Sequence, residues 1–139
     1  MPIQNIDDRL FALQTRNTSY IISLSKEGIL ENLYWGKRIE RAEDFLGETS
    51  NEKTLNMQGP QLFREECSSF GAMCFKEASM KVRFPGNVRD FRYKFSGCRV
   101  RGETLELILE DIYYPFQVHL FYEVYPEADM IKKWRKAEN

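Results

Sequence analysis

Hydrophobic and polar residues alternate with a period of two along most of this chain. Tyr20, Ile22 and Leu24, for example, alternate with polar positions such as Ser23. This period is typical of strands with one buried and one solvated face, as in antiparallel sheets. The same pattern recurs at Met80–Phe84, Phe91–Phe95, Leu105–Leu109 and Phe116–Val124. Together these segments predict about eight short strands.

Turn-forming residues separate the predicted strands. Lys26-Glu27-Gly28 and Arg101-Gly102-Glu103 each contain a glycine, which tolerates the positive φ of a tight turn. Pro85-Gly86-Asn87 predicts the clearest hairpin. Short strands at regular spacing favour an all-β sandwich or barrel over a βαβ fold.

The segment from Arg38 to Phe75 breaks the strand pattern. Within it, Ile39–Phe45 and Gln61–Cys67 predict at most one or two short helical turns. A connection this long is often functional or forms an interface, and a disordered surface loop is the alternative.

The composition fits one domain that spans residues 1–139. Of the 139 residues, 42% are hydrophobic, 29% are charged and 14% are aromatic, and the aromatic content favours strands. The formal net charge of -1 lacks the basic surplus of a nucleic-acid-binding surface. The basic run Lys132–Lys136 is interleaved with acids nearby, so we interpret it as a solvated strand face.

Targeting signals and cysteines bear on the compartment. The N-terminal sequence lacks the features of a signal peptide, and no apolar stretch has the length of a membrane span. The three cysteines are odd in number, and without an export signal they are most simply reduced thiols. We therefore expect a cytoplasmic protein with no membrane or nucleic-acid partner.

Few residues are arranged for chemistry. His119, the only histidine, lies on the polar side of its strand without a nucleophile at supporting spacing. Cys67, Cys74 and Cys98 do not have the spacing of a four-ligand metal site, and no glycine-rich phosphate loop is present. We expect no catalytic residue, no metal site and no cofactor.

Carboxylates occur as sequence neighbours, at Glu43-Asp44, Glu65-Glu66 and Glu110-Asp111. On a strand, neighbouring side chains point to opposite faces, so adjacency does not make a catalytic pair. The expected role of each carboxylate is a solvated one.

Aromatic and apolar residues raise the question of what covers them. Trp35 can stack on a sugar ring, although capping a core at the end of a strand is the commoner role. Several apolar residues lie on predicted wet faces and call for cover by a second layer of this domain, a neighbouring domain or a subunit. These residues are Ile21, Ile108, Phe121 and Tyr125.

A set of short segments, in order along the chain, carries a family resemblance. They are Phe11-Ala12-Leu13-Gln14, Thr18-Ser19-Tyr20, Leu33-Tyr34-Trp35-Gly36-Lys37, Glu103-Thr104-Leu105-Glu106, Tyr122-Glu123-Val124-Tyr125 and Asp129-Met130-Ile131. At these residues the chain resembles the N-terminal domain of microbial α-galactosidases, glycoside hydrolases that act on melibiose and raffinose.

The resemblance implies a large, twisted, antiparallel β-sandwich of the supersandwich type that precedes a catalytic (β/α)8 barrel. In the family, two aspartates of the barrel perform retaining hydrolysis, and no residue here matches either motif. The chain alone is therefore predicted to be inactive. The implied partners are the barrel or a neighbouring subunit in a homo-oligomer, and α-galactosides are candidate ligands. The Arg38–Phe75 segment corresponds to a loop near a neighbour's pocket, with Glu43 and Asp44 as its polar contacts. These two residues and Trp35, whose ring can stack on a sugar, are the candidate substrate-binding residues.

The chain also departs from the family. Where relatives have Glu-Tyr-Pro, an aromatic-Gly pair and Asp-Phe-Arg, this chain has Glu66-Cys67-Ser68, Phe70-Gly71 and Cys74-Phe75-Lys76. These replacements indicate a divergent subgroup or a fragment free to drift. The expected function is a non-catalytic domain that supports the barrel and subunit assembly. The alternative is a stand-alone carbohydrate-binding or protein-interaction sandwich, for which Trp35, Tyr113, Tyr114 and Trp134 are exposed-aromatic candidates.

Overall fold

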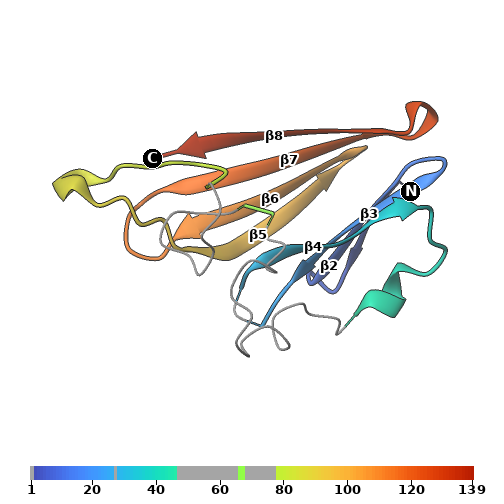
Figure 1. The fold of residues 1–139 in the computed structure, drawn as a ribbon, viewed down its shortest axis with the longest axis horizontal. Helices are drawn as coiled ribbons and strands as arrows, with labels where there is room; N and C mark the ends of the chain where they lie inside the picture. The colour runs from blue at the N-terminus through green and yellow to red at the C-terminus, as the bar shows by residue number, and fades with distance from the viewer. Residues whose placement is uncertain (1, 27, 47–65, 68–77) are drawn as a thin grey trace.

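The strands form two antiparallel layers (Figure 1). The computed structural model describes residues 2–26, 28–46, 66–67 and 78–139. Each sheet has four strands, joined to their sequence neighbours in the orders β1-β2-β3-β4 and β5-β6-β7-β8. The strands are β1 (Ile3–Ile6), β2 (Leu10–Gln14), β3 (Thr18–Leu24), β4 (Leu30–Lys37), β5 (Tyr93–Arg101), β6 (Thr104–Asp111), β7 (Gln117–Tyr125) and β8 (Met130–Glu138).

The main core lies between the two sheets. In β6 and β7, every second residue is buried, as the alternating sequence predicts. Phe11 of β2 meets Phe95 of β5 across the gap, with ring centroids 6.1 Å apart. Tyr20 of β3 meets Tyr122 of β7 in the same way, at 6.3 Å. These contacts confirm the predicted all-β sandwich.

The outer face of the first sheet is covered by the chain itself. A short 3-10 helix, η1 (Ala42–Phe45), follows β4 and buries Ala42 against Leu10 and Ile21. The β2 strand is consequently buried on both faces along its whole length. The cover over Ile21 is thus a segment of the same chain, and η1 fits the short helical turn expected between residues 38 and 75.

The outer face of the second sheet has no comparable layer among the described residues. Ile108 and Phe121 are half-buried there, and Tyr125 is exposed. A bulge between Phe95 and Gly97 disturbs the register of β5, which is an end strand of this sheet. What covers these apolar residues therefore remains a prediction.

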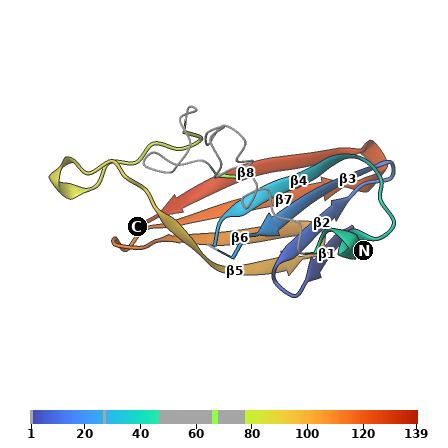
Figure 2. The same ribbon diagram turned by 60° about the horizontal axis from the view of Figure 1, so that its bottom comes forward.

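One predicted strand is wrong. Met80–Phe84 alternates in sequence, yet among the described residues it holds only isolated bridge positions, at Met80 and at Phe84, which pairs with Val88 around η3 (Pro85–Asn87). Part of segment 78–92 extends past the strand ends near the C-terminus (Figures 1 and 2). Met80, Val82 and Phe84 nevertheless contribute side chains to the main core, without belonging to a named strand. A further 3-10 turn, η4 (Pro126–Ala128), follows directly after β7. Within the described part of the chain, no helix has the length and apolar character needed to cross a bilayer.

A hydrogen-bonded clamp joins the two sheets at one end. Asp129, in the β7–β8 turn, accepts hydrogen bonds from the Thr15 hydroxyl at 2.8 Å and from the Asn17 backbone N–H at 2.7 Å. The Asn17 side-chain amide donates a third bond, at 2.6 Å. These bonds, led by the backbone N–H of Asn17, lower the pKa of Asp129. Asp129 also has a left-handed φ of 52°, which aspartate and asparagine tolerate better than most residues.

We predict that Asp129→Asn makes the protein's stability less dependent on acid pH. The pKa of Asp129 is lower in the folded protein than in the unfolded chain, where it is about 4. The carboxylate therefore stabilises the fold above about pH 4, and this stabilisation is lost as the pH falls toward the folded-state pKa. Urea unfolding at a series of pH values should show a shallower acid decline for Asp129→Asn. Glu127→Gln, an exposed change in η4, is the control and should keep the wild-type slope. Identical slopes for all three proteins would contradict the clamp's role.

Candidate functional site

A carboxylate lies buried where the two sheets meet the long connection. The Glu66 backbone N–H donates to the Leu30 carbonyl of β4 at 2.9 Å. Its side chain, only 2% exposed, reaches across to Lys133 of β8. Glu66 therefore lies between β4 and β8 and contacts both sheets. We call Glu66, Tyr20, Tyr122 and Lys133 the Glu66 cluster.

Three donors satisfy the Glu66 carboxylate. The Tyr20 hydroxyl donates to Oε1, and the Tyr122 hydroxyl donates to Oε2 at 2.7 Å. Lys133 Nζ donates to the same Oε2 at 2.7 Å, and also lies 5.4 Å from the centre of the Tyr122 ring. A buried charge is tolerated when it is paired and hydrogen-bonded, as here.

The cluster changes the acid–base behaviour of both tyrosines. Burial, and then the negative charge of Glu66, raise the pKa of Tyr20 and of Tyr122 well above the ordinary tyrosine value. Both hydroxyls therefore stay protonated and act as hydrogen-bond donors. With its oxygens occupied in this way, Glu66 is arranged as a structural anchor between the sheets.

The sequence predicted solvated roles for Glu66, Asp111 and Lys133, and the structure corrects these three predictions. Glu66 is buried, and so is Asp111, whose Oδ2 accepts hydrogen bonds from the backbone N–H groups of Tyr113 and Tyr114, both at 2.8 Å. Lys133 points to Glu66 instead of lying on a solvated face. The sequence did contain a signal: tyrosines on the dry sides of two strands need a polar partner for their hydroxyls.

Trp35 does not cap the core, because 75% of its surface is exposed. Its ring meets the edge of Tyr20 with centroids 6.0 Å apart, so it lies at the rim of the Glu66 cluster. The commoner role considered for Trp35 is therefore wrong, and the side chain is free for a contact.

Glu43 and Asp44 are not brought together with Trp35. Both lie on η1, where Asp44 pairs with Arg41 at 3.6 Å. That helix packs on the outer face of the first sheet, through contacts such as Phe45 with Tyr34. Trp35, the next residue after Tyr34, is on the opposite face beside Tyr20. A shared site of these three residues stays a prediction.

The remaining described residues that could react, a histidine and two cysteines, are buried or contact other side chains. His119 Nδ1 lies 2.6 Å from Glu106 Oε1 on the outer face of the second sheet. Burial, followed by a hydrogen bond to Asp8, raises the pKa of Cys98 to about 11, so this thiol is a poor nucleophile at neutral pH. Cys67 is buried and outside any disulfide, with Ser79 Oγ 3.9 Å from its Sγ, and Cys74 lies outside the described residues. In the described ranges, no three His, Cys, Asp or Glu side chains gather in a way that could hold a metal ion.

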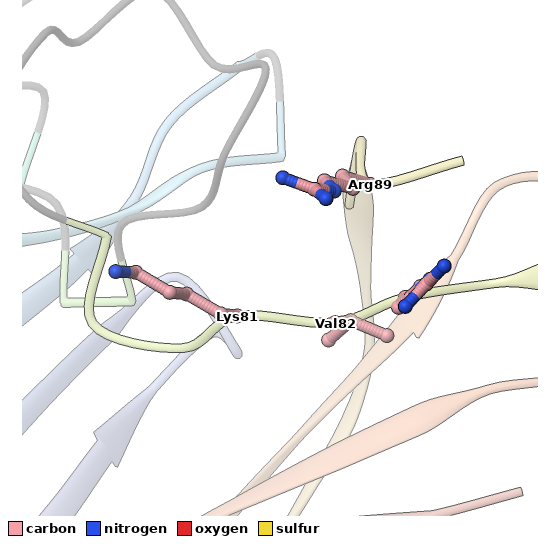
Figure 3. A pocket seen from close by; sticks show the side chains of 4 residues that line it. Lys81, Val82 and Arg89 are labelled. Atoms are coloured by element: carbon pink, nitrogen blue, oxygen red, sulfur yellow. The ribbon is translucent and has the colours of Figure 1, made fainter. Parts of the chain in front are cut away.

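A basic hollow of about 340 Å³ lies beside segment 78–92. Figure 3 shows Lys81 and Val82 on one stretch of chain and Arg89 on another, facing the same space. Arg83 also lines it. Positive side chains without a carboxylate among the described lining favour an anionic neighbour over acid–base chemistry.

These features define a class of protein: an antiparallel β-sandwich in which a buried carboxylate, from the connection between β4 and β5, contacts both sheets. The Glycosyl hydrolase family 36 N-terminal domain matches residues 28–139, and the chain belongs to this family.

Similar proteins are much longer than this chain. The bifunctional alpha-galactosidase/sucrose kinase AgaSK of Mediterraneibacter gnavus is 23% identical over 99% of this chain, which spans 18% of that protein. Among solved structures, the alpha-galactosidase AgaB from Geobacillus stearothermophilus has a TM-score of 0.82 at 20% identity, covering 100% of this chain and 22% of AgaB. The alpha-galactosidase from Lactobacillus brevis has a TM-score of 0.76 at 22% identity, covering 92% and 21% respectively. The chain thus corresponds to about a fifth of these relatives.

We predict that Glu66→Gln lowers the free energy of unfolding by about 2–4 kcal/mol. The amide keeps one acceptor oxygen and places an NH2 donor against either Tyr20 or the pair Tyr122 and Lys133, and it removes the charge that Lys133 neutralises. Lys133, 38% exposed, recovers part of its hydration. Urea unfolding followed by circular dichroism measures the loss. Glu43→Gln, an exposed carboxylate on η1, is the matched control and should change stability by less than about 0.5 kcal/mol. Equal effects of the two changes would show that Glu66 does not anchor the sheets.

Proposed function

We propose that this chain is a non-catalytic N-terminal β-domain of an α-galactosidase-like glycoside hydrolase. Its role is to pack against a catalytic (β/α)8 barrel and to help assemble subunits. The observation that carries the proposal is the family match over residues 28–139, in a chain that spans 18% of its relative AgaSK.

The geometry of the Glu66 cluster supports an inactive domain. Retaining glycosidases place two carboxyl groups about 5–5.5 Å apart across a sugar pocket. The Glu66 oxygens instead face two tyrosine hydroxyls and Lys133 in the sandwich interior. A carboxylate held in this way stabilises the fold and is not placed against a substrate.

Trp35 is the candidate contact that the geometry favours. Its exposed ring, on β4, is available to the catalytic domain or to a neighbouring subunit of a homo-oligomer. Glu43 and Asp44, on the other side of the first sheet, are proposed polar contacts to a different part of that assembly. An α-galactoside would meet these residues only where a partner completes the pocket. That Cys67 and Cys98 are in the reduced form supports a cytoplasmic location.

A stand-alone interaction module is the second candidate. Tyr113 is 80% exposed, and the Asp111 carboxylate holds its backbone N–H, so the ring is presented from a fixed turn. Fixed, exposed aromatic residues are common in binding surfaces.

We predict that the 139-residue chain alone does not hydrolyse an aryl α-galactoside. Release of the nitrophenol from p-nitrophenyl α-galactoside should equal the background rate, and Glu66→Gln should give the same rate. Hydrolysis that disappears in Glu66→Gln would overturn the non-catalytic assignment.

We also predict that Trp35→Ala weakens self-association while leaving the free energy of unfolding within about 0.5 kcal/mol, because the side chain contributes little to the core. Sedimentation velocity measures the association, and urea unfolding measures the stability. Tyr113→Ala, a similarly exposed aromatic change in the connection between β6 and β7, is the control and should leave association unchanged. A large loss of stability in Trp35→Ala would instead indicate a packing role.

A further inference from the structure

Two like charges are held opposite each other at the basic hollow beside segment 78–92. Phe84 and Val88 form an antiparallel bridge across the η3 turn. Arg83 and Arg89 are the next residues outward on the two arms of this turn, so their side chains lie on the same side of it, and both line the hollow. Like charges in directly opposed positions repel each other and destabilise the local structure.

The turn that carries these two arginines is anchored in the core. Phe84 is only 8% exposed, and its ring stacks on Tyr114 with centroids 4.1 Å apart and an interplanar angle of 6°. The backbone N–H of Tyr114 in turn donates to the Asp111 carboxylate at 2.8 Å. Gly86 has the left-handed φ of 78° that the turn requires. The two arginines therefore project from a backbone that is fixed on both sides of the turn.

Within the described ranges, no carboxylate pairs with the two guanidinium groups. Arg83 and Arg89 are exposed, and in this part of the chain neither takes part in an ion pair or a side-chain hydrogen bond. Asp90 is the only acidic residue of segment 78–92, and it lines a neighbouring hollow together with Arg92. Lys81, a third cation, faces the basic hollow (Figure 3). The segment thus has a local positive surplus, although the whole chain has a formal net charge of -1.

An anionic partner would relieve this repulsion, and an acidic protein segment fits the surface better than other anions do. Because the guanidinium groups are exposed, water and salt would screen a small anion that makes only a few contacts. A nucleic acid carries charge along its whole length and would extend onto the acid-rich remainder of the chain. A peptide carboxylate accepts the parallel N–H groups of an arginine, and Val82, in the same lining, offers an apolar contact to the rest of the peptide.

We propose that the basic hollow is a docking surface for an acidic segment of a protein partner, with Arg83 and Arg89 each binding a carboxylate. The inference rests on the second candidate function, an interaction module, and names the chemistry of its partner. It requires neither a catalytic barrel nor the contact at Trp35.

A short fluorescein-labelled poly-glutamate peptide is the probe for this surface. Its fluorescence anisotropy should rise saturably during titration with the 139-residue chain at low ionic strength. The dissociation constant should increase as salt is added, because the contacts are between exposed charges.

Two double variants locate the site. Arg83→Gln combined with Arg89→Gln should weaken binding roughly tenfold, since two charge-assisted contacts are lost. Arg9→Gln combined with Arg101→Gln is the matched control, because it removes the same charge from exposed residues between β1 and β2 and at the end of β5. The control should leave the dissociation constant unchanged. Thermal unfolding verifies folding, and loss of the like-charge pair should raise the melting temperature of the first variant.

Three outcomes would overturn the inference. The first is the absence of saturable binding at low ionic strength. The second is an equal loss in the two double variants, which would make binding a response to net charge. The third is tighter binding of inorganic phosphate or oligouridylate than of the peptide, which would assign the surface to another class of anion. The sedimentation test of Trp35→Ala reports on the scaffold role separately, so the failure of one proposal is distinguishable from the failure of the other.

Discussion

The burial of one carboxylate constrains this structure more than any other single interaction. Glu66 lies between β4 and β8, and its charge is balanced by Lys133 and by hydroxyls from each sheet. If any of these donors were displaced, a charged group would be left short of partners in a medium that solvates it poorly. The distance between the sheets and the path of the chain at Glu66 are therefore fixed together.

Sequence periodicity was sufficient for the strands and for the class of fold. In β6 and β7 each dry position is fully buried, because the two-residue period is a property of the strand itself. The same reasoning failed at Met80–Phe84, where the alternation is present and side chains pack against the core, but no named strand includes the segment. A strand also needs an adjacent strand to which its backbone can hydrogen-bond. The alternation of hydrophobic and polar residues does not show whether such a strand is present.

The candidate site was harder to predict from the sequence than the strands were, because it depends on contacts between residues far apart along the chain. Glu66 is 46 residues from Tyr20 and 56 from Tyr122, so nothing local indicates that they meet. Trp35 has the large, mainly apolar side chain that is common in cores, yet it lies on an end strand and remains exposed. The side-chain pairs on the outer face of the second sheet likewise depend on register, which places Phe121 opposite Trp134 and Glu106 opposite Arg99.

The bulge in β5 has a consequence for behaviour in concentrated solution. β5 and β8 are the two ends of their sheet, and each is nine residues long. Long, flat end strands are templates on which another molecule can add its own strand. The bulge between Phe95 and Gly97 interrupts that template on one side, and the lysines and arginine between positions 132 and 136 repel a like-charged copy on the other. Both features oppose indefinite strand-by-strand growth into aggregates.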